Sequence, residues 1–427
     1  MEIKNIKNMR LIFFSKYVII ASALIVSLTA IHCFIKKPLL KAGIWRATIQ
    51  RPDRQQIVFN FETKDTAGKT ILYVINGSER LLVDSIVLKN DSVFIVLPFF
   101  ENGFKAKLID DNTLQGSWIK NFGTTIQSLP FTAKLNSKRF DATAEPAANI
   151  TGRWSTDFIN KENKVSKLVG EFNQQGAHLT GTFLDPTGDY RFLEGIVNGD
   201  SLKLSGFDGG HAFLFTAKIN NSNKITGGKF YSGASSVQDW SAVKDDKAAI
   251  PDGYNATTLN AAAGKLNFSF PDVQTGKNIS ITDEMYAGKV VVLQILGSWC
   301  PNCMDETSFL SGYYKKNQAR GVEIIGLAYE RTTDFKSSQK SLQSFQKRFN
   351  VQYPVLVSGV AISDTLRAEK TLPQLGKIAG FPTTIFINKK GEISKVHTGY
   401  NGPATGVHYE EYKKEFNALI EKLLAEK

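Results

Sequence analysis

Apolar and polar residues divide the chain into three stretches with different patterns. Residues 17–35 form an uncharged, mostly apolar run whose length suits a membrane-crossing helix, which needs about 20 residues. From about 43 to 245, short segments alternate apolar with polar residues between Gly, Asn and Asp, which predicts antiparallel strands of a barrel or sandwich. After residue 265, the apolar runs 289–296 and 321–328 enclose a helical pattern, which predicts a βαβ unit with two parallel strands.

The alternating stretch contains an internal repeat. Three short motifs recur at a single offset of 109 residues. The sequence at 43–45 is similar to that at 152–154, the sequence at 91–93 to that at 200–202, and the sequence at 131–133 to that at 240–242. We therefore predict two all-β modules, over residues 41–140 and 148–245, followed by a small-residue linker over 246–264. The second module faintly resembles an up-and-down barrel of the avidin or lipocalin kind, and this resemblance identifies no ligand residues. Neither module shows a catalytic motif, so a binding role and a spacer role both stay open.

Two cysteines, Cys300 and Cys303, stand after the apolar run 289–296, where a helical pattern begins. Cysteines three residues apart at a helix start are close enough to form a disulfide. Unpaired backbone N–H groups and the positive end of the helix dipole stabilise a thiolate on the first of them. Thiols in such pairs commonly have pKa values well below the ordinary value of about 8.5. The motif therefore predicts thiol–disulfide exchange.

Other interpretations of the cysteine pair explain less of the pattern. Half of a zinc site would need two more ligands, but the third cysteine is the distant Cys33 and the histidines are scattered. A structural disulfide would hardly span two residues between a strand and a helix, and a reduced pair in the core would not need Pro301 between its members. We therefore expect a redox site that needs no metal or organic cofactor.

The cysteine motif and its surroundings resemble a known family. The stretch from Trp299 to Cys303, preceded by the apolar run, resembles the active site of the thioredoxin superfamily. It is more specifically similar to the membrane-tethered bacterial thiol–disulfide oxidoreductases of the TlpA/ResA type. The other features that match this type are residues 268–273 with Gly276, Glu306, residues 380–387 and residues 389–392. The resemblance implies a thioredoxin-like α/β fold over residues 265–427.

The resemblance also implies roles for individual residues. Cys300 attacks a partner disulfide, and Cys303 then resolves the mixed disulfide. The residues implied to support the active site are Trp299, Pro301, Phe381 and Pro382. The bond before Pro382 is expected to be cis, as X–Pro bonds alone commonly are, and to pack against the disulfide. Phe381 is expected to lie against the bound partner.

The expected proton acceptor is Glu306. Soluble thioredoxins have a buried aspartate six residues before the first cysteine, whereas this chain has Gln294, which cannot take a proton. Resolution of the mixed disulfide needs Cys303 as a thiolate, yet burial raises the pKa of a thiol. Glu306 follows Cys303 by three residues and would lie near it on a helix. The alternative is an exposed Glu306 that merely benefits from the helix dipole.

The N-terminal 40 residues predict export. Positive charges precede the apolar run, which favours a cytoplasmic N-terminus and an exported chain. The run 17–35 would then be a membrane anchor or signal segment. Lipidation of Cys33 is the alternative, although His32 stands where a lipoprotein cleavage box has a small residue. Both alternatives predict a protein tethered in the cell envelope, on the periplasmic side of a bacterial membrane.

Composition and charge narrow the expected partners. The 427 residues are 42% hydrophobic and 22% charged, which suits several globular domains. The formal net charge is +12, but basic residues are spread among acidic ones, so we expect no nucleic acid partner. The family suggests exported cysteine-containing proteins, such as apocytochromes, and an upstream membrane electron donor. Net oxidation of partners remains an alternative, as does a ligand-binding surface protein whose redox domain is secondary.

Overall fold

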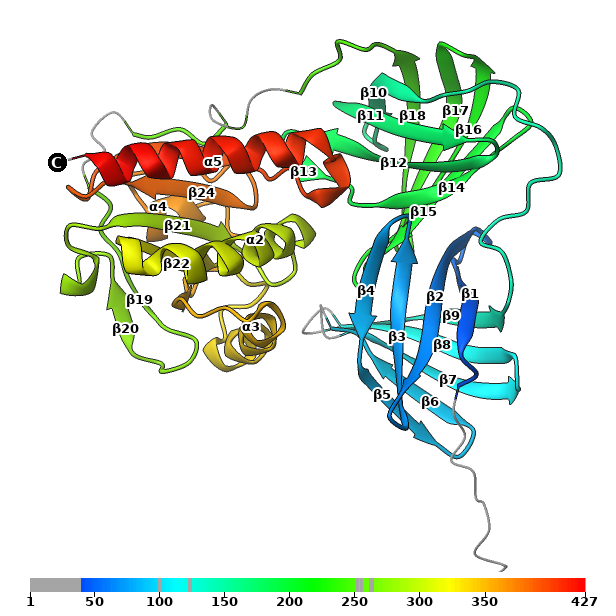
Figure 1. The fold of residues 1–427 in the computed structure, drawn as a ribbon, viewed down its shortest axis with the longest axis horizontal. Coiled ribbons are helices and arrows are strands. Elements are labelled where there is room, and N and C mark those ends of the chain that lie inside the picture. The colour runs from blue at the N-terminus through cyan, green and yellow to red at the C-terminus, as the bar shows by residue number, and fades with distance from the viewer. Residues whose placement is uncertain are drawn as a thin grey trace, which may run out of the picture.

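The computed structural model describes residues 40–98, 102–121, 125–250, 253, 256–260 and 265–426. These residues form two β-sheets, one after the other in the chain, and an α/β domain that contains Cys300 and Cys303 (Figure 1). The apolar segment 17–35, predicted to anchor the chain, and Cys33 lie outside the described residues. Within the part of the chain that is described, no helix is both long and apolar enough to cross a membrane.

The first sheet is a nine-stranded antiparallel meander. Its strands are β1 (Gly43–Gln50), β2 (Gln56–Thr66), β3 (Lys69–Asn76), β4 (Glu79–Val83), β5 (Ser85–Lys89), β6 (Ser92–Val96), β7 (Gly103–Asp110), β8 (Thr113–Asn121) and β9 (Ile126–Leu135). Their order is β4-β3-β2-β1-β9-β8-β7-β6-β5, so the first and last strands pair in the middle. Trp45, Ala47 and Ile49 of β1 are buried, as expected for a strand that turns alternate residues toward a core.

The second sheet has the same antiparallel connectivity as the first, but it closes into a barrel. Its strands are β10 (Gly152–Ile159), β11 (Val165–Gln175), β12 (His178–Asp185), β13 (Gly188–Asp189), β14 (Leu193–Asn198), β15 (Ser201–Phe207), β16 (Ala212–Asn221), β17 (Lys224–Ser232) and β18 (Ser236–Lys244). The order is β11-β10-β18-β17-β16-β15-β14-β12-β13, and pairing of β11 with β12 closes an up-and-down barrel. β10, β11 and β12 begin 109 residues after β1, β2 and β3. The prediction of antiparallel all-β modules is thus confirmed.

The two sheets differ at one seam, which is closed in the second and open in the first. In the barrel, β12 pairs with β14 at positions that include Gly181 and Gly195. A Cβ atom on either glycine would overlap a backbone carbonyl of a neighbouring strand. Glycine within a strand permits such a close approach of backbones. The first sheet has Leu72 and Ile86 at the positions 109 residues earlier, and there β3 and β5 do not pair.

The α/β domain has a mixed sheet between two layers. Its strands are β21 (Val290–Leu296), β22 (Val322–Ala328), β23 (Val355–Val357), β24 (Thr383–Ile387) and β25 (Ile393–Thr398), in the order β23-β22-β21-β24-β25. The first three run parallel, and β24 and β25 are antiparallel to their neighbours. One face carries α2 (Pro301–Asn317), α3 (Phe335–Phe349) and α5 (Val407–Ala425). The other face carries α4 (Arg367–Thr371) and the hairpin of β19 (Ser269–Pro271) and β20 (Asn278–Ser280).

Local sequence sets several element bounds of this domain. α3 begins at Phe335, because the Asp334 side chain caps it by accepting the N–H of Ser337. β23 begins at Val355, after Pro354, which has no N–H for a sheet. α2 ends at Asn317 before a 3-10 turn (Gln318–Arg320).

The β-modules contact the α/β domain at the end where β21 meets α2. Arg348 of α3 donates to the Leu82 carbonyl of β4 at 3.0 Å. His408 of α5 pairs with Glu171 of β11 at 2.9 Å. Figure 1 shows β13 near the first turns of α5, on the side of the domain that faces the barrel. The cysteine end of the α/β domain therefore faces the two modules.

Candidate active site

Cys300 and Cys303 lie at the junction of β21 and α2, as the sequence predicts. Cys300 is the N-cap of α2, and Pro301 is its first residue, where a missing N–H costs no helical hydrogen bond. The cysteines form a disulfide with their Cα atoms 5.2 Å apart. The Cys300 Sγ atom accepts the backbone N–H of Cys303 at 3.2 Å. After reduction, this donor and the helix dipole favour the thiolate form of Cys300.

The residues expected to support the motif surround it. The Trp299 ring packs edge-on against the Phe381 ring with centroids 5.4 Å apart, and its Nε1 donates to the Tyr329 carbonyl at 2.8 Å. The bond between Phe381 and Pro382 is cis, as predicted. Glycine is required at Gly297, because a Cβ atom there would overlap the Trp299 indole. The motif and the cis-proline loop are therefore in direct contact through Trp299.

Glu306 is fully buried, so the alternative of an exposed glutamate is wrong. Its carboxylate accepts hydrogen bonds from Gln294 Nε2 (2.8 Å), Thr384 Oγ1 (2.6 Å) and Tyr412 OH (2.9 Å). Burial raises the pKa of Glu306 to about 7, although the three donors favour the charged form and oppose this rise. A carboxyl group with such a pKa exchanges its proton near neutral pH.

Gln294 connects Glu306 with the cysteine helix. Besides bonding the carboxylate, its Nε2 atom lies 3.5 Å from the Cys303 carbonyl oxygen. The titratable carboxyl group near the second cysteine is therefore on α2, while β21 supplies a neutral amide. Sequence spacing indicated that Glu306 takes the place of the buried aspartate, but it did not indicate that Thr384 and Tyr412 would bond its carboxylate. These two reach Glu306 from β24 and α5, and neither belongs to a motif that signals the contact.

Residues of both β-modules reach the start of α2, which sequence reasoning missed. Arg191, which follows β13, binds Asp305 of α2 and Glu79 of β4 with N–O distances of 2.5 Å in both pairs. Asp189 of β13 accepts the backbone N–H of Gly402 at 2.8 Å. Burial, helped by the nearby Asp305 carboxylate, raises the pKa of Asp189 to about 7. No sequence signal joins these residues, because they lie far apart along the chain in two β-modules and the α/β domain.

A cavity of about 280 Å³ lies between the modules and the residues that follow Cys300. Aromatic side chains of the second module, which include Tyr190, Phe213 and Phe230, line it together with Pro301 and Asn302 of the motif. Among the residues that the structure describes, no group of three or more His, Cys, Asp or Glu side chains is placed to bind a metal ion. The arrangement therefore offers a dithiol, a buried carboxyl group and an adjoining cavity.

These features define a class of protein. A central parallel strand leads into a helix whose N-cap begins a Cys-X-X-Cys disulfide, and a cis-proline loop packs beside it. This is the arrangement of a thioredoxin-like domain that performs thiol–disulfide exchange. In agreement, the family model for Redoxin matches residues 260–412.

Comparison with known proteins identifies the family. The thiol-disulfide oxidoreductase ResA of Bacillus subtilis is 28% identical over 34% of this chain and 74% of its own length. ResA of Halalkalibacterium halodurans is 31% identical over 33% of this chain and 70% of its own. A solved thiol-disulfide isomerase from Corynebacterium glutamicum is similar at 21% identity, covering 39% of this chain and 100% of its own, with a TM-score of 0.31. The chain belongs to the TlpA/ResA-type thiol–disulfide oxidoreductases of the thioredoxin superfamily.

Proposed function

We propose that this thiol–disulfide oxidoreductase is exported to the cell envelope and reduces disulfides of exported proteins. The observation that supports partner reduction is the buried Glu306, whose pKa is raised to about 7 by burial, three residues after Cys303. A reductant must form the Cys303 thiolate inside the protein to release its partner, and a buried thiol resists ionisation. An oxidant can leave this last step to a second thiol of the partner. A proton acceptor near Cys303 speeds the release of a reduced partner, which suits the proposed reductant, and the reduction potential decides the direction.

The proposed reaction begins from the dithiol form. The Cys300 thiolate attacks one sulfur of the partner disulfide, which forms a mixed disulfide and releases the other partner sulfur as a thiolate. Cys303 gives its proton to the Glu306 carboxylate and attacks the Cys300 sulfur. This forms the Cys300–Cys303 disulfide and releases the second partner thiolate. Two electrons pass from the dithiol to the partner, so an upstream electron donor must restore the dithiol.

Export and tethering are supported by the N-terminal sequence. The run 17–35 has the length and composition of a membrane-crossing helix, and lipidation of Cys33 is the alternative anchor. The proposed partners are exported cysteine-containing proteins, such as the apocytochromes that the family reduces. The proposed electron donor lies in the same membrane.

The equilibrium reduction potential of the Cys300–Cys303 pair tests the direction. A value close to that of thioredoxin, about −270 mV, supports the proposed reductant, whereas a value near −120 mV would establish net oxidation of partners. Trapping tests the roles of the two sulfurs. Cys303→Ser should accumulate mixed disulfides with partners, and Cys300→Ser should accumulate none. Mixed disulfides in Cys300→Ser alone would reverse the assigned roles.

The cavity beside the second module favours a second candidate function. Cavities with aromatic walls and a few polar groups are typical ligand sites, and Tyr190, Phe213 and Phe230 provide such walls here. In this alternative, the β-modules bind a ligand or partner, and the redox domain is secondary. Reduction of insulin by the full-length protein separates the two candidates. A correctly folded protein that fails to reduce insulin would favour the binding function.

A further inference from the structure

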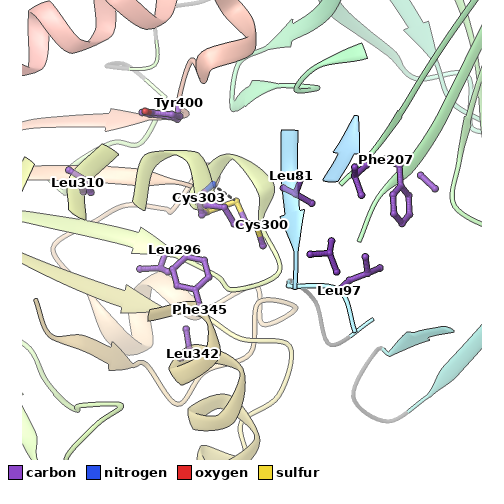
Figure 2. Packing of buried hydrophobic residues seen from close by; sticks show 14 of the residues in the cluster. Leu81, Leu97, Phe207, Leu296, Cys300, Cys303, Leu310, Leu342, Phe345 and Tyr400 are labelled. Carbon is purple, nitrogen blue, oxygen red and sulfur yellow. Dashed lines mark hydrogen bonds between the residues drawn. A yellow bond between two sulfur atoms is a disulfide. The ribbon is translucent and has the colours of Figure 1, made fainter. Parts of the chain in front are cut away.

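The sulfur that must meet a partner is covered in this structure. Only 4% of Cys300 is exposed, although a partner disulfide has to reach it. Leu81 of β4 and Leu97, which follows β6, belong to the same cluster of buried apolar side chains as Cys300 and Met304. Figure 2 shows Cys300 at the edge of the α/β domain on the side of Leu81 and Leu97. A protein disulfide therefore cannot approach Cys300 while the first module keeps this position.

The turn from β12 to β13 covers the residues between the two cysteines. The Asn302 side-chain amide donates to the Asp189 carbonyl and accepts the Asp189 N–H, each at 3.1 Å. An amide that bonds both main-chain groups of one residue recognises backbone, as an added strand is recognised at a sheet edge. The preceding Gly188 has a φ of +148°, and a Cβ atom on it would overlap the Asn302 amide. The contact therefore requires a segment without a side chain at this point.

The same turn lies on the loop before the cis-proline. A Cβ atom on Gly380 would meet the Thr187 side chain, and one on Gly399 would lie 3.0 Å from the Pro186 carbonyl oxygen. Two glycines of the α/β domain thus allow its backbone to approach residues 186 and 187 closely. Residues 186–189 therefore cross both the motif and the neighbouring loop.

We propose that residues 186–189 act as an internal competitor: they occupy the partner-docking face of the thioredoxin-like domain at Asn302, Gly380 and Gly399, and they exclude the cysteine-bearing segment of a partner protein until they leave. This inference rests on the proposed exchange with partner proteins. The partner segment that fits is exposed and flexible, because the surface binds main-chain groups. It has a glycine beside its cysteine, because the position that Gly188 occupies leaves no room for a Cβ atom.

An ionic contact holds the competitor in place. Arg191 binds Glu79 and Asp305 and also donates to the Pro301 carbonyl at 3.3 Å. It thereby joins the two β-modules to the first turn of α2. Loss of this contact weakens the attachment of the turn 186–189 and of the first module to α2 at the same time. A docking partner therefore takes the place of the modules at this surface, and the two cannot bind there together.

The first test measures access to Cys300 in the reduced, full-length protein. The rate at which a bulky maleimide labels Cys300 is followed by peptide mass spectrometry. Gly188→Ala and Arg191→Gln weaken the internal contact, and each should raise the rate about tenfold or more. Gly176→Ala is the matched control, because Gly176 also has a positive φ in the second module but has open space around it. Its labelling rate should not change.

An unchanged labelling rate would contradict the proposal. Unchanged labelling in both Gly188→Ala and Arg191→Gln would overturn the proposal, and the second variant decides if the first fails to fold. Labelling reports access whatever the direction of electron flow. Faster labelling without insulin reduction would therefore defeat the proposed function alone, whereas normal insulin reduction with unchanged labelling would defeat this inference alone.

The second test separates a docking surface from a merely structural contact. Asn302→Ala removes the amide from the internal competitor and from the partner at once. Labelling of Cys300 should become faster, while the KM for insulin should rise because the partner loses its backbone contact. Faster labelling with a lower KM would mean that Asn302 only holds the modules, and would overturn the docking role.

Discussion

Replacing Glu306 with glutamine removes the group that we propose takes the proton of Cys303. The amide oxygen can still accept hydrogen bonds from Thr384 and Tyr412. The new amide nitrogen would face Gln294 Nε2, and half a turn of the Gln294 amide restores a hydrogen bond between the two side chains. The substitution therefore removes a buried charge and keeps the packing around it.

The size of the effect follows from the pKa shift. Burial raises the pKa of Glu306 from the model-compound value of 4.5 to about 7, so the folded state keeps the proton to a higher pH than the unfolded state. Stability from the protonated carboxyl group is complete below pH 4.5 and is lost as the pH rises through 7. At about 1.36 kcal/mol per pKa unit, the charge costs about 3 kcal/mol at pH 8 but less than about 1 kcal/mol at pH 5.

Glu306→Gln carries no such charge, so its stability relative to the native protein should change with pH. The gain should grow by about 2 to 3 kcal/mol between pH 5 and pH 8. Hydrogen exchange of the β21 amides in the oxidised protein measures it, because β21 is the central strand and reports unfolding of the domain. Comparison of variant and native protein at the same pH cancels the intrinsic exchange rate.

The matched control is Glu369→Gln, since Glu369 is an exposed residue of α4. It should show no such pH dependence. The same Glu306→Gln protein should reduce insulin more slowly, with a flatter dependence of rate on pH, because Cys303 has lost its proton acceptor. A stability difference that stays constant between pH 5 and pH 8, or an unchanged rate–pH profile, would refute the reasoning.

Two further predictions follow from the site and the N-terminal sequence. Thr384→Val removes one donor from the Glu306 carboxylate and should raise its pKa further, which moves the rate–pH profile for insulin reduction to higher pH; a shift to lower pH would contradict the assignment. The segment 17–35 should remain as an anchor, so the mature protein should begin near Met1 and leave the membrane only with detergent. A lipid-bearing N-terminus at Cys33 would establish a lipoprotein instead.

The reactive centre could be predicted from the sequence because local patterns determine it. A buried apolar run followed by Cys-X-X-Cys specifies a strand that ends at a helix N-cap, and the structure has β21 and α2 there. The cis bond before Pro382 was implied by the family resemblance of residues 380–387, and it agrees with the rule that cis bonds are common only before proline. Apolar–polar alternation and the offset of 109 residues likewise indicated two antiparallel sheets, since the side-chain direction along a strand alternates by local geometry.

The environment of that centre was decided only by the tertiary structure. Spacing places Glu306 near Cys303, but its burial depends on β24 and α5, whose Thr384 and Tyr412 lie far along the chain. The cover over the active site comes from residues more remote still: Leu81 lies in one apolar cluster with Cys300, and the turn 186–189 contacts Asn302. Their own patterns specify only strands and a turn, because periodicity records which face of an element is buried and not which surface covers it. Local sequence therefore determines the reactive centre, whereas access to that centre depends on how the β-modules pack against the α/β domain.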